Sequence, residues 1–232
     1  MTGKSLILVA ALSSVFSLAC ADSVSVKKVQ TEKMVQQAEA REEEKAETNV
    51  RTMEDWISLG VSRAEEGDFN KAKKAFKEAI RINPDVAEAH YRLGLAYREL
   101  GDTRYAVRAF KEAIRINPEL ADAYYNLGII YRETGNEKGA LKAFEVAIRL
   151  DPYNAYAHYD LGEIYLSMRF KKKAKGSYIN AIDIKPDFAA AYYRLGSIHI
   201  MFNDIDSAFD VYKILVNLDR QLAYKLFNQI YK

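Results

Sequence analysis

The stretch FKEAIRINP occurs twice, letter for letter, at residues 76–84 and 110–118. Looser copies follow as FEVAIRLDP at 144–152 and YINAIDIKP at 178–186, so that each copy starts 34 residues after the last. The chain's four prolines share this spacing; they are Pro84, Pro118, Pro152 and Pro186. A fixed period of this size indicates a stacked array of structural repeats rather than one mixed core.

Alignment on the prolines gives five units, at residues 53–86, 87–120, 121–154, 155–188 and 189–222. Within a unit, a ring or His comes fourth, Leu-Gly seventh and eighth, and Tyr eleventh. Ala then comes twentieth, an aromatic residue twenty-fourth, Ala twenty-seventh and Pro thirty-second. These positions lie three or four residues apart, which places each set on one face of a helix. Each unit is therefore predicted to be two amphipathic helices.

The glycines and prolines predict how the helices meet and end. Small residues at positions eight and twenty allow close approach of the paired helices, and the rings fill the space around them. The turns Gly67-Asp68, Gly101-Asp102 and Gly135-Asn136 predict a left-handed glycine followed by an N-capping side chain. Proline lacks an N–H group, so it suits a helix start and cannot continue the preceding helix.

This pattern resembles the tetratricopeptide repeat family, W-x2-L-G-x2-Y…A-x3-F…P, over residues 53–222. The resemblance implies an all-α fold, a right-handed α-solenoid of five antiparallel helical hairpins. It also implies that the first helix of each hairpin lines an inner surface that binds peptides. The last unit departs from the pattern at His199, Leu215 and Arg220. After it, Leu222, Leu226 and Ile230 predict a capping helix that continues through residues 223–232.

Composition and motifs argue against several functions. A net charge of +2 disfavours nucleic acid as the main partner. No phosphate-binding glycine loop, cysteine pair or nucleophile motif is present. The three histidines, His90, His158 and His199, fall on core positions of the repeat, so no metal or other cofactor is expected. We therefore expect a protein that is not an enzyme.

Residues 1–21 have the features of a bacterial export signal: a short charged start, an apolar middle and small residues at the end. Two processing routes are open, and a third possibility is that the signal stays uncut and anchors the chain in the membrane. Ala19-Cys20-Ala21 fits cleavage before Asp22, whereas Ser17-Leu18-Ala19-Cys20 resembles a lipobox in which Cys20 is lipidated, with Ser in place of the preferred Leu. The following polar segment, 22–52, is predicted to be a linker, partly helical or disordered. Both routes place the protein in the periplasm or on a membrane of the cell envelope.

The first helices carry the predicted binding site. Position five gives a ladder of four tyrosines, and Tyr and Arg dominate binding energy at interfaces. The predicted peptide-binding groove consists of Tyr91, Arg92, Leu95, Arg98, Tyr125, Asn126, Ile129, Arg132, Tyr159, Tyr193 and Arg194. It suits a segment with apolar anchors and a few acidic groups. The alternative is that the tyrosines only cover the helix surface. The family's carboxylate-clamp pattern is absent.

We therefore predict a protein-interaction scaffold of the cell envelope that binds a protein or peptide partner. Two alternatives stay open. One is an accessory subunit of an envelope secretion, pilus or polysaccharide-export machine, and the other is a structural array that self-associates. The basic run RFKKKAK at 169–175 offers an acidic partner or lipid headgroups a contact, or is simply a solvated turn.

Overall fold

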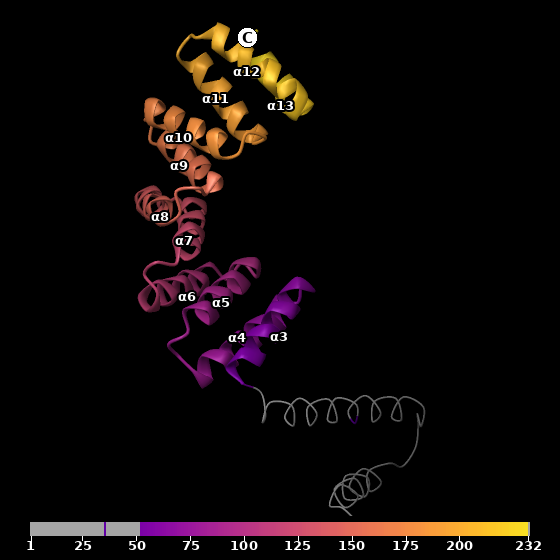
Figure 1. Ribbon diagram of the computed structural model, residues 1–232, viewed down its shortest axis with the longest axis vertical. Helices are drawn as coiled ribbons and strands as arrows, with labels where there is room; N and C mark the ends of the chain where they lie inside the picture. Colours follow the sequence, from indigo (N-terminus) through magenta and orange to yellow (C-terminus); the bar gives the residue numbers. More distant parts are fainter. Residues whose placement is uncertain (1–34, 36–51, 232) are drawn as a thin grey trace, which may run out of the picture. The chain divides into compact units, whose positions relative to one another are not determined.

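The computed structural model describes residue 35 and residues 52–231, and in this part of the chain every regular element is a helix. Residues 52–231 form five consecutive helical hairpins and one further helix (Figure 1). The hairpins are α3 (Met53–Glu65) with α4 (Phe69–Ile82), α5 (Ala87–Glu99) with α6 (Thr103–Ile116), α7 (Ala121–Glu133) with α8 (Glu137–Leu150), α9 (Ala155–Ser167) with α10 (Lys171–Ile184), and α11 (Ala189–Met201) with α12 (Ile205–Leu218). The last helix is α13 (Arg220–Ile230). The predicted fold class, an α-solenoid of five hairpins with a closing helix, is confirmed.

The hairpins pack in chain order. Each first helix packs against its own second helix, and that second helix packs against the first helix of the next hairpin. The core is therefore a continuous series of small interfaces, as expected for a repeat array. The alanines at position twenty are all fully buried: Ala72, Ala106, Ala140, Ala174 and Ala208.

The glycine at position eight sets the spacing between the two helices of a hairpin, because it contacts a ring of the second helix. In the second unit, a Cβ atom added at Gly94 would lie 2.6 Å from Cε1 of Phe110, the ring at position twenty-four. Gly128 stands in the same relation to Phe144, and Gly162 to Tyr178, each again at 2.6 Å. Such a distance is far inside van der Waals contact, so the ring occupies the volume that any side chain would need. The close approach predicted from the sequence is confirmed.

In the fifth unit, a different side chain packs over the glycine at position eight. Gly196 faces Leu226 of α13, whose Cδ2 would lie 2.5 Å from an added Cβ. The ring at position twenty-four, Tyr212, points elsewhere and contacts Phe209 and Phe227, with centroids 5.3 and 5.5 Å away. Leu226 is fully buried. The closing helix therefore supplies the side chain that the repeat supplies in the other units.

The turns within the hairpins use a left-handed residue. Gly67, Gly101 and Gly135 have φ values of 79°, 75° and 75°. Arg169 and Asn203 take the same conformation in the last two units, with φ values of 65° and 61°. The left-handed conformation is open to glycine and strained for arginine, because Cβ meets the backbone.

Two predictions about helix ends need correction. Asp68 and Asn136 do cap the next helix, accepting from the N–H groups of Lys71 and Gly139, but Asp102 forms no side-chain cap. The prolines do not start helices: Pro84 lies in a turn, and α5 begins at Ala87. Proline excludes continuation of α4, while the turn that follows carries the chain into the next unit.

The export signal, Cys20 and almost all of the predicted linker lie outside the described residues. Among the helices that the structure does describe, none combines the length and apolar character that a membrane span requires.

Candidate functional site

The four predicted ladder tyrosines lie on α5, α7, α9 and α11, and all are partly buried. Three of their rings rest on the ring at position twenty-four of the same unit. Tyr91 contacts Phe110 and Tyr125 contacts Phe144, each with centroids 5.9 Å apart, and Tyr159 contacts Tyr178 at 5.7 Å. The ring faces are therefore held by the core, so only part of each ring is open to a partner.

The hydroxyl groups of the ladder bridge neighbouring units. Tyr125 Oη donates to Asp160 Oδ2 at 3.1 Å, and Tyr91 Oη accepts from Asn126 Nδ2 at 3.5 Å. Tyr193 Oη accepts from Gln229 Nε2 of α13 at 2.7 Å. The first two contacts join a first helix to the first helix of the next unit, and the third joins α11 to the closing helix α13. The ladder thus connects units as well as covering them.

Burial raises the pKa of Tyr91, Tyr125 and Tyr159 above the usual tyrosine range. The negative charge of a neighbouring carboxylate raises the pKa further: Asp160 acts on Tyr125, and Glu163 acts on Tyr159. The phenols are therefore neutral at physiological pH, where a neutral hydroxyl can both donate and accept a hydrogen bond.

The arginines of the predicted groove are paired within the chain. Arg132 bonds to Asp160, and Arg194 Nη2 lies 2.6 Å from Glu163 Oε2. Arg92 pairs with Glu88 on its own helix. Arg98 differs, because its contact across the unit boundary is the neutral Asn126, while its ion pair is to the neighbouring Glu99 at 2.9 Å. Arg98 therefore has, like Arg92, an acid partner only on its own helix, and the side chain that it meets across the unit boundary is neutral.

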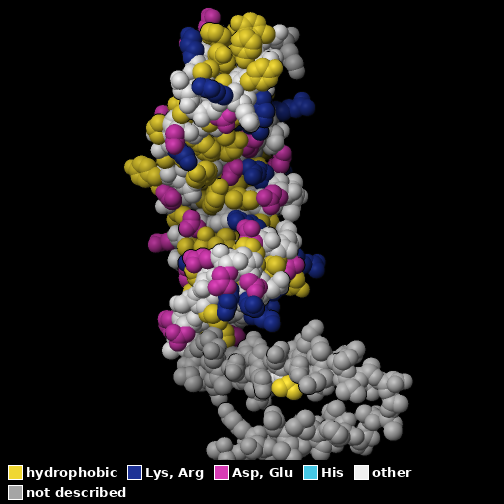
Figure 2. Space-filling model, turned by 90° about the vertical axis from the view of Figure 1, so that its right-hand side faces the viewer, with side chains coloured by type: hydrophobic (Ala, Val, Ile, Leu, Met, Phe, Trp, Pro, Cys, Tyr) yellow, Lys and Arg dark blue, Asp and Glu magenta, His cyan; other side chains and the backbone are white. Residues whose placement is uncertain are grey.

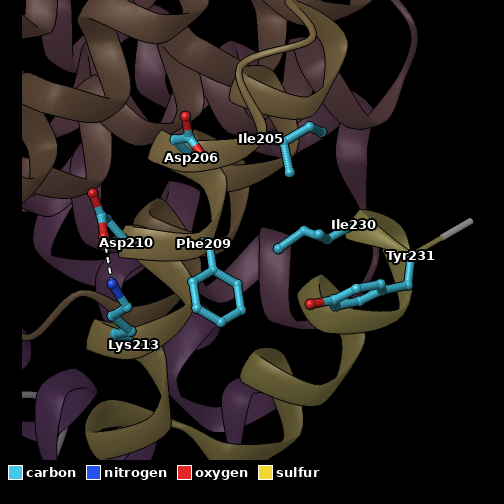
Figure 3. Close-up of a pocket in the computed structure, with 7 residues that line it drawn as sticks. All are labelled: Ile205, Asp206, Phe209, Asp210, Lys213, Ile230 and Tyr231. Carbon is cyan, nitrogen blue, oxygen red and sulfur yellow. Dashed lines mark hydrogen bonds and ion pairs between the residues drawn. The ribbon is translucent and has the colours of Figure 1, made fainter.

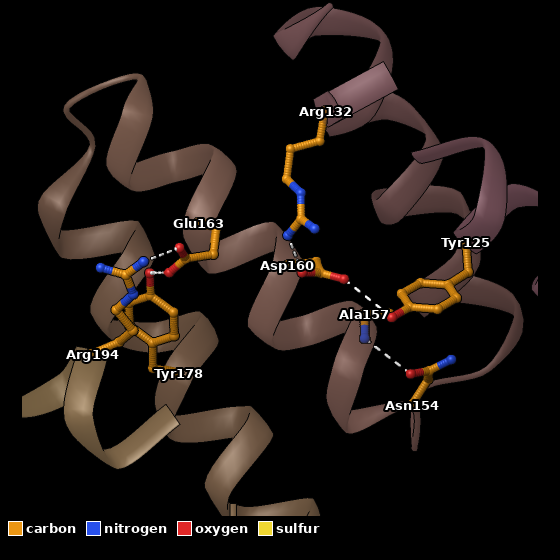
Figure 4. Close-up of polar contacts among 8 residues, drawn as sticks. All are labelled: Tyr125, Arg132, Asn154, Ala157, Asp160, Glu163, Tyr178 and Arg194. Atoms are coloured by element: carbon orange, nitrogen blue, oxygen red, sulfur yellow. Dashed lines mark hydrogen bonds and ion pairs between the residues drawn. The ribbon is translucent and has the colours of Figure 1, made fainter. Parts of the chain in front are cut away.

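Two acidic residues of α9 organise these contacts (Figure 4). Asp160 is only 6% exposed and accepts from both Tyr125 and Arg132. Glu163 accepts from Arg194 and from the Tyr178 hydroxyl. Burial raises the pKa of Asp160, and its two partners offset this only in part. The carboxylates link α9 to the units on either side of it.

Asp160 and Glu163 were not among the predicted site residues. A spacing could have found Asp160, although not Glu163: an arginine at position twelve is followed 28 residues later by an amide or acid at position six of the next unit. Arg98 with Asn126 and Arg132 with Asp160 both follow it.

Position nine changes character along the row of first helices. Leu95 and Ile129 are partly buried and pack against the core. The equivalent residues of the last two units are Glu163 and Ser197, and Ser197 Oγ donates to Gln229 Oε1 at 2.9 Å. The predicted groove is thus apolar over its N-terminal half and polar over its C-terminal half.

The histidines have structural partners. His90 Nε2 lies 2.9 Å from the Pro84 carbonyl oxygen, and His158 Nε2 lies 3.1 Å from that of Pro152, so both rings tie a first helix to the turn before it. His199 Nδ1 contacts Asp204 at 2.8 Å. Within residues 52–231, no group of three or more His, Cys, Asp or Glu side chains is arranged to hold a metal ion.

The family models agree with this geometry. One described as "Tetratricopeptide repeat" matches residues 93–155 and 159–223, and one described as "TPR repeat" matches residues 60–101. The chain belongs to the tetratricopeptide repeat family. Members of this family are generally interaction scaffolds without catalytic activity. No curated protein matches the chain.

Solved structures of tetratricopeptide repeat proteins share the fold. A structure titled "Crystal structure of MamA" is 30% identical, covering 72% of this chain and 97% of its own, with a TM-score of 0.66. MamA 41-end from Desulfovibrio magneticus RS-1 is 24% identical, covering 73% and 96%, also with a TM-score of 0.66. The protein YrrB, titled as having an unusual peptide-binding site, is 19% identical, covering 75% and 91%, with a TM-score of 0.64. The last two likenesses show the fold alone.

Proposed function

We propose that this tetratricopeptide repeat protein is a non-enzymatic scaffold that binds a peptide segment along its first helices. The observation that carries the proposal is the ladder of Tyr91, Tyr125, Tyr159 and Tyr193. Three of its rings pack on core rings, and three of its hydroxyl groups form hydrogen bonds to a following helix. Side chains that are already ordered lose little conformational entropy when a partner binds. A row of ordered, partly exposed tyrosines is therefore suited to binding.

The ion pairs of the arginines indicate where in the groove an acidic group of the bound peptide would lie. Arg132 and Arg194 face acids of the same surface, so they add little net charge for a ligand. Arg98 contacts the neutral Asn126 across the unit boundary and pairs with Glu99, its neighbour in the chain. Leu95 is three residues before Arg98 and Ile129 three residues after Asn126, and both are apolar and partly buried. The proposed ligand accordingly places apolar side chains at Leu95 and Ile129 and an acidic group at Arg98.

Site-specific photocrosslinking tests the groove directly. A photoreactive amino acid replaces Leu95 or Ile129 in one set of variants, and the exposed Lys111 or Glu145 on second helices in the matched set. We expect a crosslinked segment at the first-helix positions alone. A synthetic peptide of that segment should bind the purified chain, and Arg98→Glu should weaken binding by roughly tenfold. Equal crosslinking at both sets of positions, or unchanged binding by Arg98→Glu, would contradict the proposal.

Arg132→Glu is a poor test of the groove, because the new carboxylate would face the buried Asp160 and destabilise the fold. Arg92→Glu is a better companion to Arg98→Glu, since Arg92 pairs with Glu88 of its own helix at the surface.

The envelope location is part of the same proposal and is supported by the signal-like sequence of residues 1–21. The location is tested by mass spectrometry of the protein isolated from its own cells. A chain that begins at a lipid-modified Cys20 indicates a membrane anchor, and one that begins at an unmodified Asp22 indicates a periplasmic protein. A chain that retains residues 1–21 and fractionates with the cytoplasm would contradict export.

A further inference from the structure

Exposed aromatic and aliphatic side chains gather on the last hairpin and α13. The ring centroids of Tyr212 and Phe227 are 5.5 Å apart and those of Phe227 and Tyr231 are 4.5 Å apart, so that rings run from α12 onto α13. Tyr224 and Tyr231 are 67% and 68% exposed. Figure 2 shows yellow hydrophobic side chains gathered at this end of the repeats. We call this surface the C-terminal seam; it consists of Ile205, Phe209, Tyr212, Val216, Tyr224, Phe227 and Tyr231.

The C-terminal seam has two hollows. One, of about 350 Å³, lies between the start of α12 and the end of α13, where Phe209 and Tyr231 line it (Figure 3). The other, of about 330 Å³, lies between the end of α12 and the start of α13, beside Val216 and Tyr224. Each hollow has an exposed tyrosine at its edge. The surface therefore offers exposed rings and two hollows of similar volume.

The charges at the two hollows are opposite in sign. Asp206 and Asp210 line the first hollow, together with Lys213, which lies 2.8 Å from Asp210. Arg220 lines the second. Asp219 is next to Arg220, but its carboxylate accepts from the N–H groups of Gln221 and Leu222 as the cap of α13. The seam thus has an acidic end and a basic end.

The opposite end of the array lacks such a surface. In α3 no large hydrophobic side chain is among the exposed ones, and in α4 only Ile82 is, at 45%. Head-to-tail stacking of copies would therefore place the described polar face of α3 against the aromatic seam. Two seams facing each other in antiparallel directions would instead place the acidic end of each on the basic end of the other. A twofold interface of this kind uses one surface twice and closes at two copies.

We propose that the C-terminal seam binds the same seam of a second copy of this chain, forming a closed dimer. Tyr224 of each copy enters the hollow beside Asp210 of the other, and Arg220 of each copy meets that same acidic end. The apolar rings supply most of the binding energy, and the charges set the antiparallel direction. The dimer does not involve the first-helix groove and stands independently of peptide binding there.

Sedimentation velocity of the purified full chain over a range of concentrations tests the dimer. We expect a monomer–dimer equilibrium without larger species. Tyr224→Lys combined with Tyr231→Lys should weaken the dimer at least tenfold, with unchanged helical circular dichroism because both side chains are mostly exposed. The matched control is Tyr153→Lys, since Tyr153 is 82% exposed and lies in the turn between α8 and α9. This control should leave the dimer unchanged.

A charge swap tests the antiparallel direction. Arg220→Glu should weaken the dimer, and adding Asp210→Lys to the same chain should restore it, because each new glutamate then meets the partner's new lysine. A chain that is monomeric at every concentration would overturn the proposal, as would a dimer that survives the seam variants. Species larger than a dimer, or vesicle binding through the seam by a monomeric chain, would equally overturn it.

Discussion

The contacts inside the hairpins and the contacts between neighbouring first helices vary to very different degrees. Inside the first four hairpins, the ring at position twenty-four lies over the glycine at position eight in the same way from unit to unit. Between first helices, one boundary uses Arg98 with Asn126, the next uses Arg132 with Asp160, and the third uses Glu163 with Arg194. The shape contact is constant because it sets the spacing, whereas the polar contacts are free to differ once the spacing is set.

The largest expected effect comes from adding a side chain at the glycine of position eight, where the ring of position twenty-four packs. Gly128→Val should lower the free energy of unfolding by about 3 kcal/mol, because the added side chain needs the volume that the Phe144 ring occupies. Chemical denaturation monitored by circular dichroism measures the change.

The matched control is Gly176→Ala on α10, where an added Cβ meets nothing within 4 Å. Alanine is the better helix former, so this variant should gain about 0.5–1 kcal/mol. A loss at Gly176 similar to that at Gly128 would show that glycine flexibility, and not the space for the ring, sets the spacing.

The second largest effect is expected from removing an arginine that forms a polar contact between neighbouring first helices. Arg132→Met should cost about 2 kcal/mol, because it leaves the carboxylate of Asp160 buried without its cation. Arg98→Met should cost about 1 kcal/mol, since its partner Asn126 is neutral. The same denaturation assay compares them. Equal losses would mean that the charge of Asp160 is solvated and that the two boundaries do not differ.

The smallest expected effect depends on pH. Burial raises the pKa of Asp160 in the folded chain above the unfolded value of about 3.9. At pH values between the unfolded and the folded pKa, the folded state therefore binds more protons than the unfolded state. The stability contributed by Asp160 falls as the pH rises through this range. Asp160→Asn removes the titration and keeps an acceptor for Tyr125 and Arg132. Its melting temperature relative to the original chain should rise with pH from about 4 upward, and a constant difference would contradict the shift.

The sequence predicted the fold because the residues that decide it repeat in register. Gly, Ala and a ring at fixed positions leave few ways to pack two helices, so the hairpins follow from the period alone. The fifth unit was harder, because it keeps Gly196 and Tyr212 in register while the structure fills the space with Leu226. Nothing in the period shows that a later helix replaces the ring.

The sequence indicated where the row of tyrosines lies, but not all of the side chains that they and the arginines contact. Position five indicated the row of tyrosines, since a helical surface can be read from residue spacing. Asp160 and Glu163 were missed as partners, because their contacts cross between helices and depend on side-chain reach rather than on periodicity. Their effect is to offset the charges of Arg132 and Arg194 that the sequence suggested for a ligand.

The insertion of Leu226 over Gly196 also bears on how the array opens. In a repeat protein each unit touches only its neighbours, so terminal units tend to fray one at a time. Here α13 completes the packing of the fifth hairpin, and neither can detach without exposing the buried surface of the other. In hydrogen exchange, the amides of α11, α12 and α13 should therefore share one opening free energy, which makes the C-terminal end a single cooperative unit larger than the repeat itself.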